Sequence, residues 1–150
     1  MAAVPVGLLL VGVGGVQHRQ IPQGRADELL SLMCIARPIE RVPLLLDLPF
    51  KHKGVMCAPY IGRVSLKKYL SSDQIEQVLC GGENYDGARP CDFDWVKSLR
   101  EECVQANVTF CFIETGTIFV KNGKQYHLPD KALQSRMACK SGMNYAGKPM

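Results

Sequence analysis

The 150-residue sequence predicts an α/β fold with parallel strands, followed by a β-hairpin and a C-terminal helix. Short apolar runs alternate with helical segments along the chain, which is the pattern of βαβ units. The runs are apolar almost throughout, as expected for strands that are covered on both faces. Near the end, Asn122-Gly123 separates two alternating runs and is typical of a hairpin turn.

The first 24 residues form an atypical leader, for which we predict a strand and a loop. The opening "MAAVPVGLLLVGVGG" is apolar but too short to span a bilayer, so we expect no membrane partner. It has no basic start, which disfavours a signal peptide and leaves a buried strand at about residues 7–13. The polar stretch at residues 17–28 shows no periodicity and is expected to be a loop.

The next segments predict helix, strand and short helix. Residues 26–49 look helical with a break near Pro38, because Ile39, Val42, Leu45 and Leu46 recur at helical spacing. Residues 54–62 read as a strand that ends at Pro59 and Gly62. Residues 65–74 read as a brief helix with Ser65 as its N-cap.

Residues 75–83 predict a strand that stops at two glycines, and residues 92–107 predict an amphipathic helix. Asp92 is a suitable N-cap and Asn107 a suitable stop. The buried face should contain Val96, Leu99 and Cys103, at i, i+3 and i+7 spacing, and Val104 is a further candidate. Lys97 and Glu101 are expected to form an i, i+4 ion pair.

The last third predicts a strand, a hairpin and a helix. Residues 108–115 are rich in β-branched and aromatic side chains, which favour a strand. Residues 117–128 should form the hairpin around Asn122-Gly123. Residues 130–142 should form a helix that begins at an Asp130 cap and ends at Gly142.

The cysteines and the charge limit the class of protein. There are seven cysteines, no two at Cys-x-x-Cys spacing, which disfavours a zinc knuckle or a disulfide scaffold and favours the cytoplasm. The net charge of +4 lies in the tail, because residues 121–150 contain six basic residues and one acid. A solvated basic surface is the simpler interpretation, and contact with an anionic partner such as nucleic acid is the alternative.

Polar and glycine-rich segments follow three of the predicted strands. Ligands bind at the carboxyl ends of the strands in parallel sheets and barrels. We therefore expect one rim that contains the following residues: Cys57, Glu83, Asn84, Arg89, Glu114 and Thr115. His52 precedes the strand of Cys57 and should lie at the opposite end, so no catalytic pair is predicted and the catalytic residues remain unknown.

The rim residues have both a ligand-binding and a purely structural interpretation. Gly81-Gly82 could cradle an anion with backbone N–H groups, or only bend the chain. Glu83 is either a substrate contact or a solvated loop acid. Arg89 could clamp a phosphate or carboxylate, or pair with Glu83 or Glu114 to hold the loop. Glu114 ends an apolar strand, where its carboxylate needs a partner.

These strand ends resemble the phage gp thirty-seven/sixty-eight family, which is uncharacterised, occurs in phages and bacteria, and is similar to radical S-adenosylmethionine (radical SAM) enzymes. The resemblance covers roughly residues 40–147. Its members have a strand ending in Cys-Glu-Pro, then "GGES", Ala-Arg-Pro, Asp-x-x-Trp-Val and a Phe-rich strand. This chain has matching segments at Cys57-Ala58-Pro59, "GGEN", Ala88-Arg89-Pro90, Asp92-x-x-Trp95-Val96 and "TFCF", with Ala58 where many relatives have Glu.

The resemblance implies that residues 25–150 are the carboxyl-terminal part of a (β/α) barrel. It implies S-adenosylmethionine and a 4Fe–4S cluster for full-length relatives. Those relatives carry an upstream cysteine cluster that this sequence lacks, so we expect no cofactor and no metal site in this chain. Radical SAM enzymes hold the amino group of the cofactor with a Gly-Gly-Glu strand end, but theirs lies in an early strand, whereas Gly81-Gly82-Glu83 lies late.

The predicted function is therefore a phage-family, radical-SAM-like partial barrel that is not active alone, from a truncated or frameshifted gene. Its ligand-binding residues would be Gly81, Gly82, Glu83, Asn84, Arg89 and Glu114. An open half-barrel would expose strand edges and self-associate. The alternatives are a small anion- or nucleotide-binding α/β module, and a nucleic-acid-binding accessory protein that uses the basic tail.

Overall fold

A computed structural model describes residues 9–12, 15–18, 30–34 and 42–148. Strands β1 (Leu9–Gly12) and β2 (Gly15–His18) pair antiparallel. The strand expected at about residues 7–13 overlaps β1, but Gln17 and His18 lie in β2 and not in a loop. The predictions for residues 19–28 and for Ile39 lie outside the described residues.

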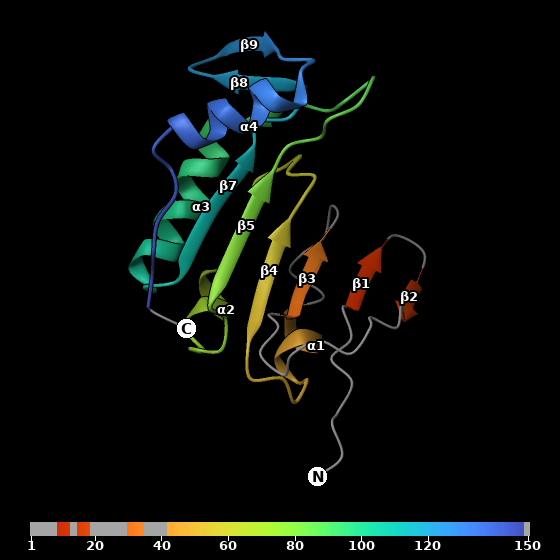
Figure 1. The fold of residues 1–150 in the computed structure, drawn as a ribbon. Coiled ribbons are helices and arrows are strands. Elements are labelled where there is room, and N and C mark those ends of the chain that lie inside the picture. The colour runs from red at the N-terminus through yellow and green to blue at the C-terminus, as the bar shows by residue number, and fades with distance from the viewer. Residues whose placement is uncertain (1–8, 13–14, 19–29, 35–41, 149–150) are drawn as a thin grey trace.

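Four parallel strands form the central sheet (Figure 1). They are β3 (Leu30–Cys34), β4 (Lys53–Cys57), β5 (Gln77–Gly81) and β7 (Thr109–Glu114), in the order β3-β4-β5-β7. Each strand pairs with the next of these four along the chain, so the predicted α/β fold with parallel strands is confirmed. The described strands do not close into a barrel.

The long helix expected over residues 26–49 is wrong. Leu30–Cys34 is strand β3, and the described helix there is the short α1 (Val42–Leu46). The run around Leu30–Cys34 is apolar almost throughout, so its periodicity suits a buried strand as well as a helix. Parallel pairing with β4 decides for the strand. The helical spacing does hold for Val42 and Leu45, which are both buried.

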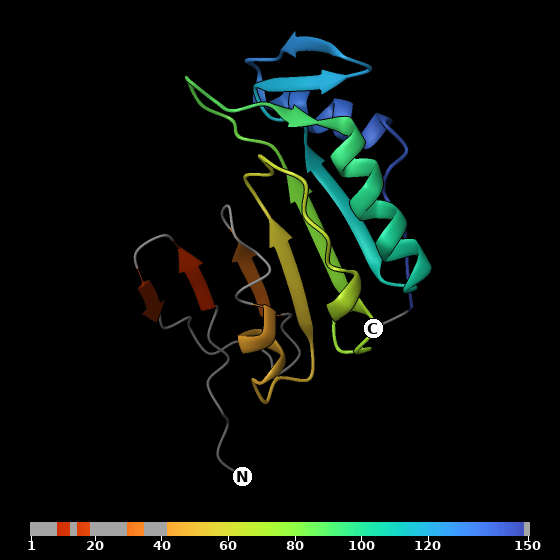
Figure 2. The same cartoon turned by 180° about the vertical axis from the view of Figure 1, so that it is seen from behind.

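Helices α2 (Lys67–Leu70) and α3 (Phe93–Gln105) lie on one face of the sheet (Figure 2). Side chains in register across β4, β5 and β7 form the buried rows under them, Val55–Val78–Phe110 and Cys57–Cys80–Phe112. The apolar face of α3 is the predicted one, because Val96, Leu99 and Cys103 are all fully buried, whereas Val104 is only partly buried. On the other face of the same strands, Met56, Leu79 and Cys111 form a row that is only partly buried.

The termini of α3 match their prediction. The Asp92 carboxylate accepts a hydrogen bond from the Asp94 amide at 2.8 Å and caps the helix. Asn107 follows the last turn with a φ of 56°, a left-handed conformation that Asn tolerates. The expected Lys97–Glu101 pair is wrong, because the Lys97 ammonium lies 2.5 Å from Asp94 and the carboxylate of Glu101 accepts from Gln105.

Ser65 is not the N-cap of the short helix. Helix α2 begins one residue later than that prediction requires, and Leu66 occupies the cap position without a side-chain hydrogen bond. The carboxylate of Glu102, on α3, accepts from the Leu66 amide at 2.8 Å and satisfies this end of α2. A tertiary contact therefore replaces the local cap.

A second sheet contains β6 (Cys91–Asp92), β8 (Ile118–Lys121) and β9 (Lys124–His127). The predicted hairpin is confirmed, and Asn122 and Gly123 have φ values of 53° and 72°, as a type I′ turn requires. Helix α4 (Lys131–Lys140) is also confirmed: Asp130 accepts from the Ala132 amide at 2.9 Å, and Gly142 has a φ of 71°.

No helix in the described part of the chain is long and apolar enough to cross a membrane.

The outer edge of β7 is covered, which corrects the expectation of exposed strand edges at this side of the sheet. Phe110 and Tyr145 exchange two backbone hydrogen bonds of 2.9 Å as an antiparallel bridge. Beyond the bridge, the side-chain oxygen of Asn144 accepts from the Phe112 amide at 2.9 Å. The segment after α4 thus occupies backbone groups that a second chain would otherwise pair with.

We predict that Asn144→Ala destabilises the protein by about 1 kcal/mol, because the Phe112 amide loses its acceptor. Asn144→Asp keeps an oxygen at the same position and should retain most of the stability. Urea unfolding of the three proteins measures the difference. Equal losses in both variants would show that the Asn144 acceptor does not hold the edge.

Candidate functional site

The carboxyl ends of β4, β5 and β7 meet in one region, joined by backbone hydrogen bonds. The amide of Tyr60, after β4, donates to the Gly81 carbonyl at 2.7 Å. The amide of Gly82 donates to the Glu114 carbonyl at 3.0 Å, and that of Thr117 donates to Glu83 at 2.7 Å. The segment after β5 therefore connects the ends of both neighbouring strands, as expected for a rim at the carboxyl edge.

Close backbone packing explains the glycines of this segment. A Cβ atom on Gly82 would lie 2.4 Å from the carbonyl oxygen of Thr115. On the facing segment, Gly116 has a φ of 79°, and a Cβ there would lie 2.7 Å from the Glu83 carbonyl oxygen. The Gly82 amide is used by Glu114, so it is not available to cradle an anion as the sequence suggested. The structural interpretation of this glycine is thus the one supported.

An irregularity in β7 accompanies this packing. Cys80 lies opposite Phe112, but Gly81 lies opposite Glu114, so Ile113 is an extra residue on β7. Such a bulge interrupts the alternation of side chains and redirects the residue that follows. Glu114 is therefore aimed at the strand-end region at the point where β7 leaves the sheet.

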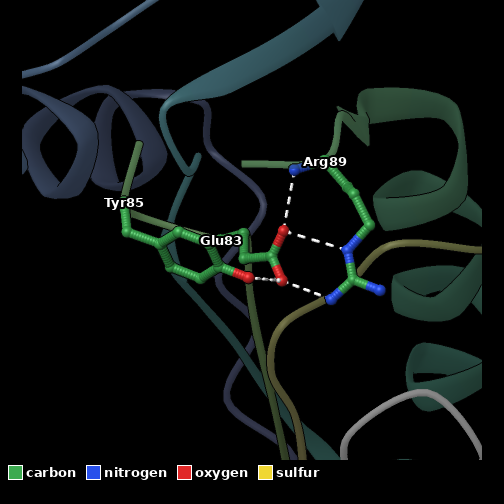
Figure 3. Close-up of polar contacts among 3 residues, drawn as sticks. All are labelled: Glu83, Tyr85 and Arg89. Atoms are coloured by element: carbon green, nitrogen blue, oxygen red, sulfur yellow. Dashed lines mark hydrogen bonds and ion pairs between the residues drawn. The ribbon is translucent and has the colours of Figure 1, made fainter. Parts of the chain in front are cut away.

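Glu83 is a buried carboxylate that Arg89 and Tyr85 enclose (Figure 3). One oxygen accepts from the Arg89 amide at 2.7 Å and from Nε of the same residue at 3.0 Å. The other oxygen accepts from the Tyr85 hydroxyl at 2.6 Å and from Nη2 of Arg89. Each oxygen has two donors, which fills the acceptor capacity of a carboxylate.

These contacts set the charges of the cluster. The hydrogen bonds from Arg89 lower the pKa of Glu83 from 4.5 to about 2, so it is ionised at neutral pH. The hydrogen bond to Glu83 raises the pKa of the Tyr85 hydroxyl, and the same carboxylate raises the pKa of Arg89. The side chain of Glu83 is 3% exposed and that of Arg89 is 54% exposed, so the part of the pair that solvent reaches is the Arg89 side chain.

Asn84 and Glu114 form the other polar pair of the rim. The side-chain nitrogen of Asn84 lies 3.2 and 3.1 Å from the two carboxylate oxygens of Glu114. Asn84 is exposed and Glu114 is partly buried, so this pair faces solvent, whereas Glu83 is enclosed. The partner that Glu114 requires at the end of an apolar strand is thus Asn84, not Arg89.

The structure brings together the six residues predicted to bind a ligand, but their contacts differ. The backbones of Gly81 and Gly82 join the strands, Glu83 anchors Arg89, and Asn84 holds Glu114. Cys57 and Thr115, also expected at the rim, are buried at 1% exposure each. His52 lies at the opposite end of the sheet, where its ring is 3.0 Å from Glu76, as expected.

Tyr85 is the member of the cluster that the sequence did not reveal. Tyr85 is 56% exposed, yet its hydroxyl donates to the buried Glu83. The one available signal was a hydroxyl-bearing aromatic residue two positions after a carboxylate in a glycine-rich turn. That spacing alone does not predict the hydrogen bond, because the turn geometry decides where the ring points.

The described residues do not fit an iron–sulfur cluster. Among the residues that the structure describes, no group of three His, Cys, Asp or Glu side chains could hold a metal. Burial raises the pKa of the Cys91 and Cys103 thiols to about 12, mainly by removing them from water. Cluster ligands are thiolates, a form that these buried positions disfavour.

Glu83 likewise does not fit the amino group of S-adenosylmethionine. Its oxygens already accept from four donors within the loop. An incoming ammonium would have to displace Tyr85 or Arg89 from a carboxylate that is almost fully buried. The Gly-Gly-Glu segment therefore acts in this structure as an internal anchor.

Comparison with known proteins gives one family. The model of the family described as protein of unknown function (DUF5131) matches residues 30–149. No curated protein and no solved structure gives a significant match. The matched residues include the central sheet, the rim and the hairpin.

We predict that Gly82→Ala destabilises the protein by about 1–3 kcal/mol, because its methyl group would collide with the Thr115 carbonyl. Gly62→Ala is the matched control, since a Cβ at Gly62 meets nothing within 4 Å. Chemical denaturation measures both variants. A Gly82→Ala protein as stable as Gly62→Ala would contradict the close packing.

Glu83 should make stability depend on acid pH. Its pKa is lowered on folding, so its contribution is present above pH 4.5 and is lost as pH falls toward about 2. We expect the stability difference between wild type and Glu83→Gln to shrink by about 1–3 kcal/mol over this range. Unfolding at a series of pH values measures it.

Glu101→Gln provides the control, because Glu101 is an exposed acid on α3. Its unfolding curve should follow that of wild type across the acid range. Parallel pH curves for wild type and Glu83→Gln would show that the Glu83–Arg89 contact does not stabilise the fold.

Proposed function

The chain belongs to the DUF5131 family of proteins of unknown function, and we propose that it acts as the carboxyl-terminal part of a radical-SAM-like (β/α) barrel of the phage gp thirty-seven/sixty-eight type. In this proposal the chain contributes a ligand-binding rim and is not active alone. The observation that carries it is the meeting of three parallel strand ends around a solvent-facing set of polar groups.

The arrangement of the sheet supports a partial barrel. The strands follow one another in sequence order, with α2 and α3 on one face (Figure 2). In a barrel of this kind the helices are outside and the opposite face of the strands is the packed interior. The row Met56–Leu79–Cys111 occupies that opposite face and is partly exposed, so further strands would bury it.

The rim offers donors and acceptors at fixed positions. Arg89 is held by the buried Glu83, so the exposed part of its guanidinium is preorganised toward solvent. Asn84 and Glu114 add an amide and a carboxylate from the neighbouring strand ends. Such a set suits a ligand that carries an anionic group together with hydroxyl or amino groups. These residues would bind the ligand and would transfer no proton.

Anaerobic reconstitution with iron and sulfide tests this proposal. We expect the chain alone to take up no 4Fe–4S cluster, because no three possible ligands in the described ranges are placed to hold a metal. We expect it to bind no S-adenosylmethionine, because the Glu83 carboxylate already accepts from Arg89 and Tyr85. The readouts are the visible absorption spectrum and calorimetric titration of S-adenosylmethionine. A stoichiometric 4Fe–4S spectrum or tight binding of the cofactor would contradict it.

A small anion-binding module that works without a cluster is the second candidate function. The observation in its favour is Arg89, whose side chain is 54% exposed although Nε and Nη2 of its guanidinium donate to Glu83. This alternative predicts that pyrophosphate shifts the amide resonances of Asn84, Arg89 and Glu114. Arg89→Gln should abolish the shifts. Arg63→Gln, which changes an arginine bonded to Ser98, should leave them intact.

A further inference from the structure

A cavity lies between the β8–β9 hairpin, the start of α3 and the end of α4. It has a volume of about 270 Å³. Its walls include Phe93, Phe119, Tyr126 and Met137, together with Lys121 and Lys140. The volume is slightly below the usual range for drug-sized ligands, so the cavity suits a small molecule.

The walls of this cavity are aromatic and partly open to solvent. Phe93 and Phe119 pack edge to face, with ring centroids 5.6 Å apart, and form its buried side. Tyr126 and Met137 are 39% and 46% exposed. They are two of the four large apolar side chains that are exposed in the described part of the chain. Their gathering at one cavity favours a ligand with a flat apolar body.

The charge of the cavity is positive. The Lys121 ammonium lies 5.1 Å from the centroid of the Phe93 ring, and Lys124 lies 5.3 Å from that of Tyr126. No Asp or Glu lines the cavity, and within the described residues neither Lys121 nor Lys140 pairs with a carboxylate. Unpaired ammonium groups beside an apolar wall attract an anion. Two of the basic residues in the tail, Lys121 and Lys140, are thus placed at one cavity.

We propose that this cavity binds a small anion with a flat aromatic body, such as a nucleoside monophosphate or an aromatic carboxylate. The aromatic body would pack on Tyr126 and Met137, and the anionic group would be neutralised by Lys121 and Lys140. Glu83, Asn84, Arg89 and Glu114 do not line this cavity. Thr115 is shared, because it lines the cavity and its carbonyl oxygen packs against Gly82.

Binding measurements with four small probes test the site. Adenosine monophosphate and indole-3-acetate carry both features, adenosine lacks the charge, and inorganic phosphate lacks the aromatic body. We expect at least one of the first two to bind about tenfold more tightly than adenosine and phosphate. Calorimetry gives the affinities, and amide resonances of Tyr126 and Ser141 locate the probe.

Variants separate the cavity from the general charge of the tail. Lys121→Gln and Lys140→Gln should each weaken binding about fivefold. Tyr126→Ala should remove the preference for aromatic anions. Lys131→Gln is the matched control, because Lys131 is exposed on the same helix as Lys140 and does not line the cavity. Circular dichroism confirms that each variant is folded.

Three results would overturn the proposal. The first is that neither aromatic anion binds more tightly than adenosine and phosphate at millimolar concentration. The second is that the Lys121, Lys140 and Lys131 variants behave alike. The third is that a single-stranded ten-nucleotide oligothymidylate binds more than tenfold more tightly than adenosine monophosphate, with strong salt dependence, which would identify a nucleic-acid contact instead.

Discussion

The structure of the strand-end region depends on the hydrogen bonds that the buried Glu83 carboxylate accepts from Arg89 and Tyr85. Burial of an ionised group is costly unless its hydrogen-bonding capacity is filled, and here Arg89 and Tyr85 fill it. The loop after β5 must therefore fold back so that the Arg89 amide and side chain both reach Glu83. The same backbone segment bonds to Thr117 and places Asn84 beside Glu114. One buried charge thus fixes the loop, the neighbouring strand ends and the exposed guanidinium.

That arrangement is feasible only because the backbones after β5 and β7 approach closely. Gly82 and Gly116 face one another where any Cβ atom would collide with a carbonyl oxygen. Beyond this contact the chain enters β8, the hairpin and α4, which enclose the aromatic cavity. The positions of the rim and of the cavity therefore both depend on the contact between the segment after β5 and the segment after β7. The rim residue Glu114 precedes Thr115-Gly116 in the chain, and the β8–β9 hairpin of the cavity follows it. A ligand in either place would contact elements whose positions this contact sets.

The elements that the sequence predicted well are those with local signals. Asp92 and Asp130 cap helices by bonding to amides two residues away, and Asn122-Gly123 adopts the left-handed conformations of its turn. One local prediction was wrong, because Lys97 pairs with Asp94 and not with Glu101. The larger errors occur where residues distant in the sequence determine the structure. Leu30–Cys34 is a strand because β4 pairs with it, and α2 is capped by Glu102 of α3. The edge of β7 is covered by Asn144 and Tyr145, a contact that the hydrophobic periodicity of the sequence does not predict.

For the site, the sequence alone determined that polar residues would gather at the carboxyl edge of a parallel sheet, because strand direction fixes which ends meet. The sequence also predicted two alternative roles for Arg89: binding an anionic ligand, or forming an ion pair with Glu83 or Glu114. Only the tertiary structure decided that Glu83 is buried and accepts from Arg89, while Glu114 is only partly buried and accepts from the exposed Asn84. The reason is physical: a carboxylate is internal or external according to how closely the surrounding backbone packs. That packing follows from the contact at Gly82 and Gly116, which the order of residues does not reveal.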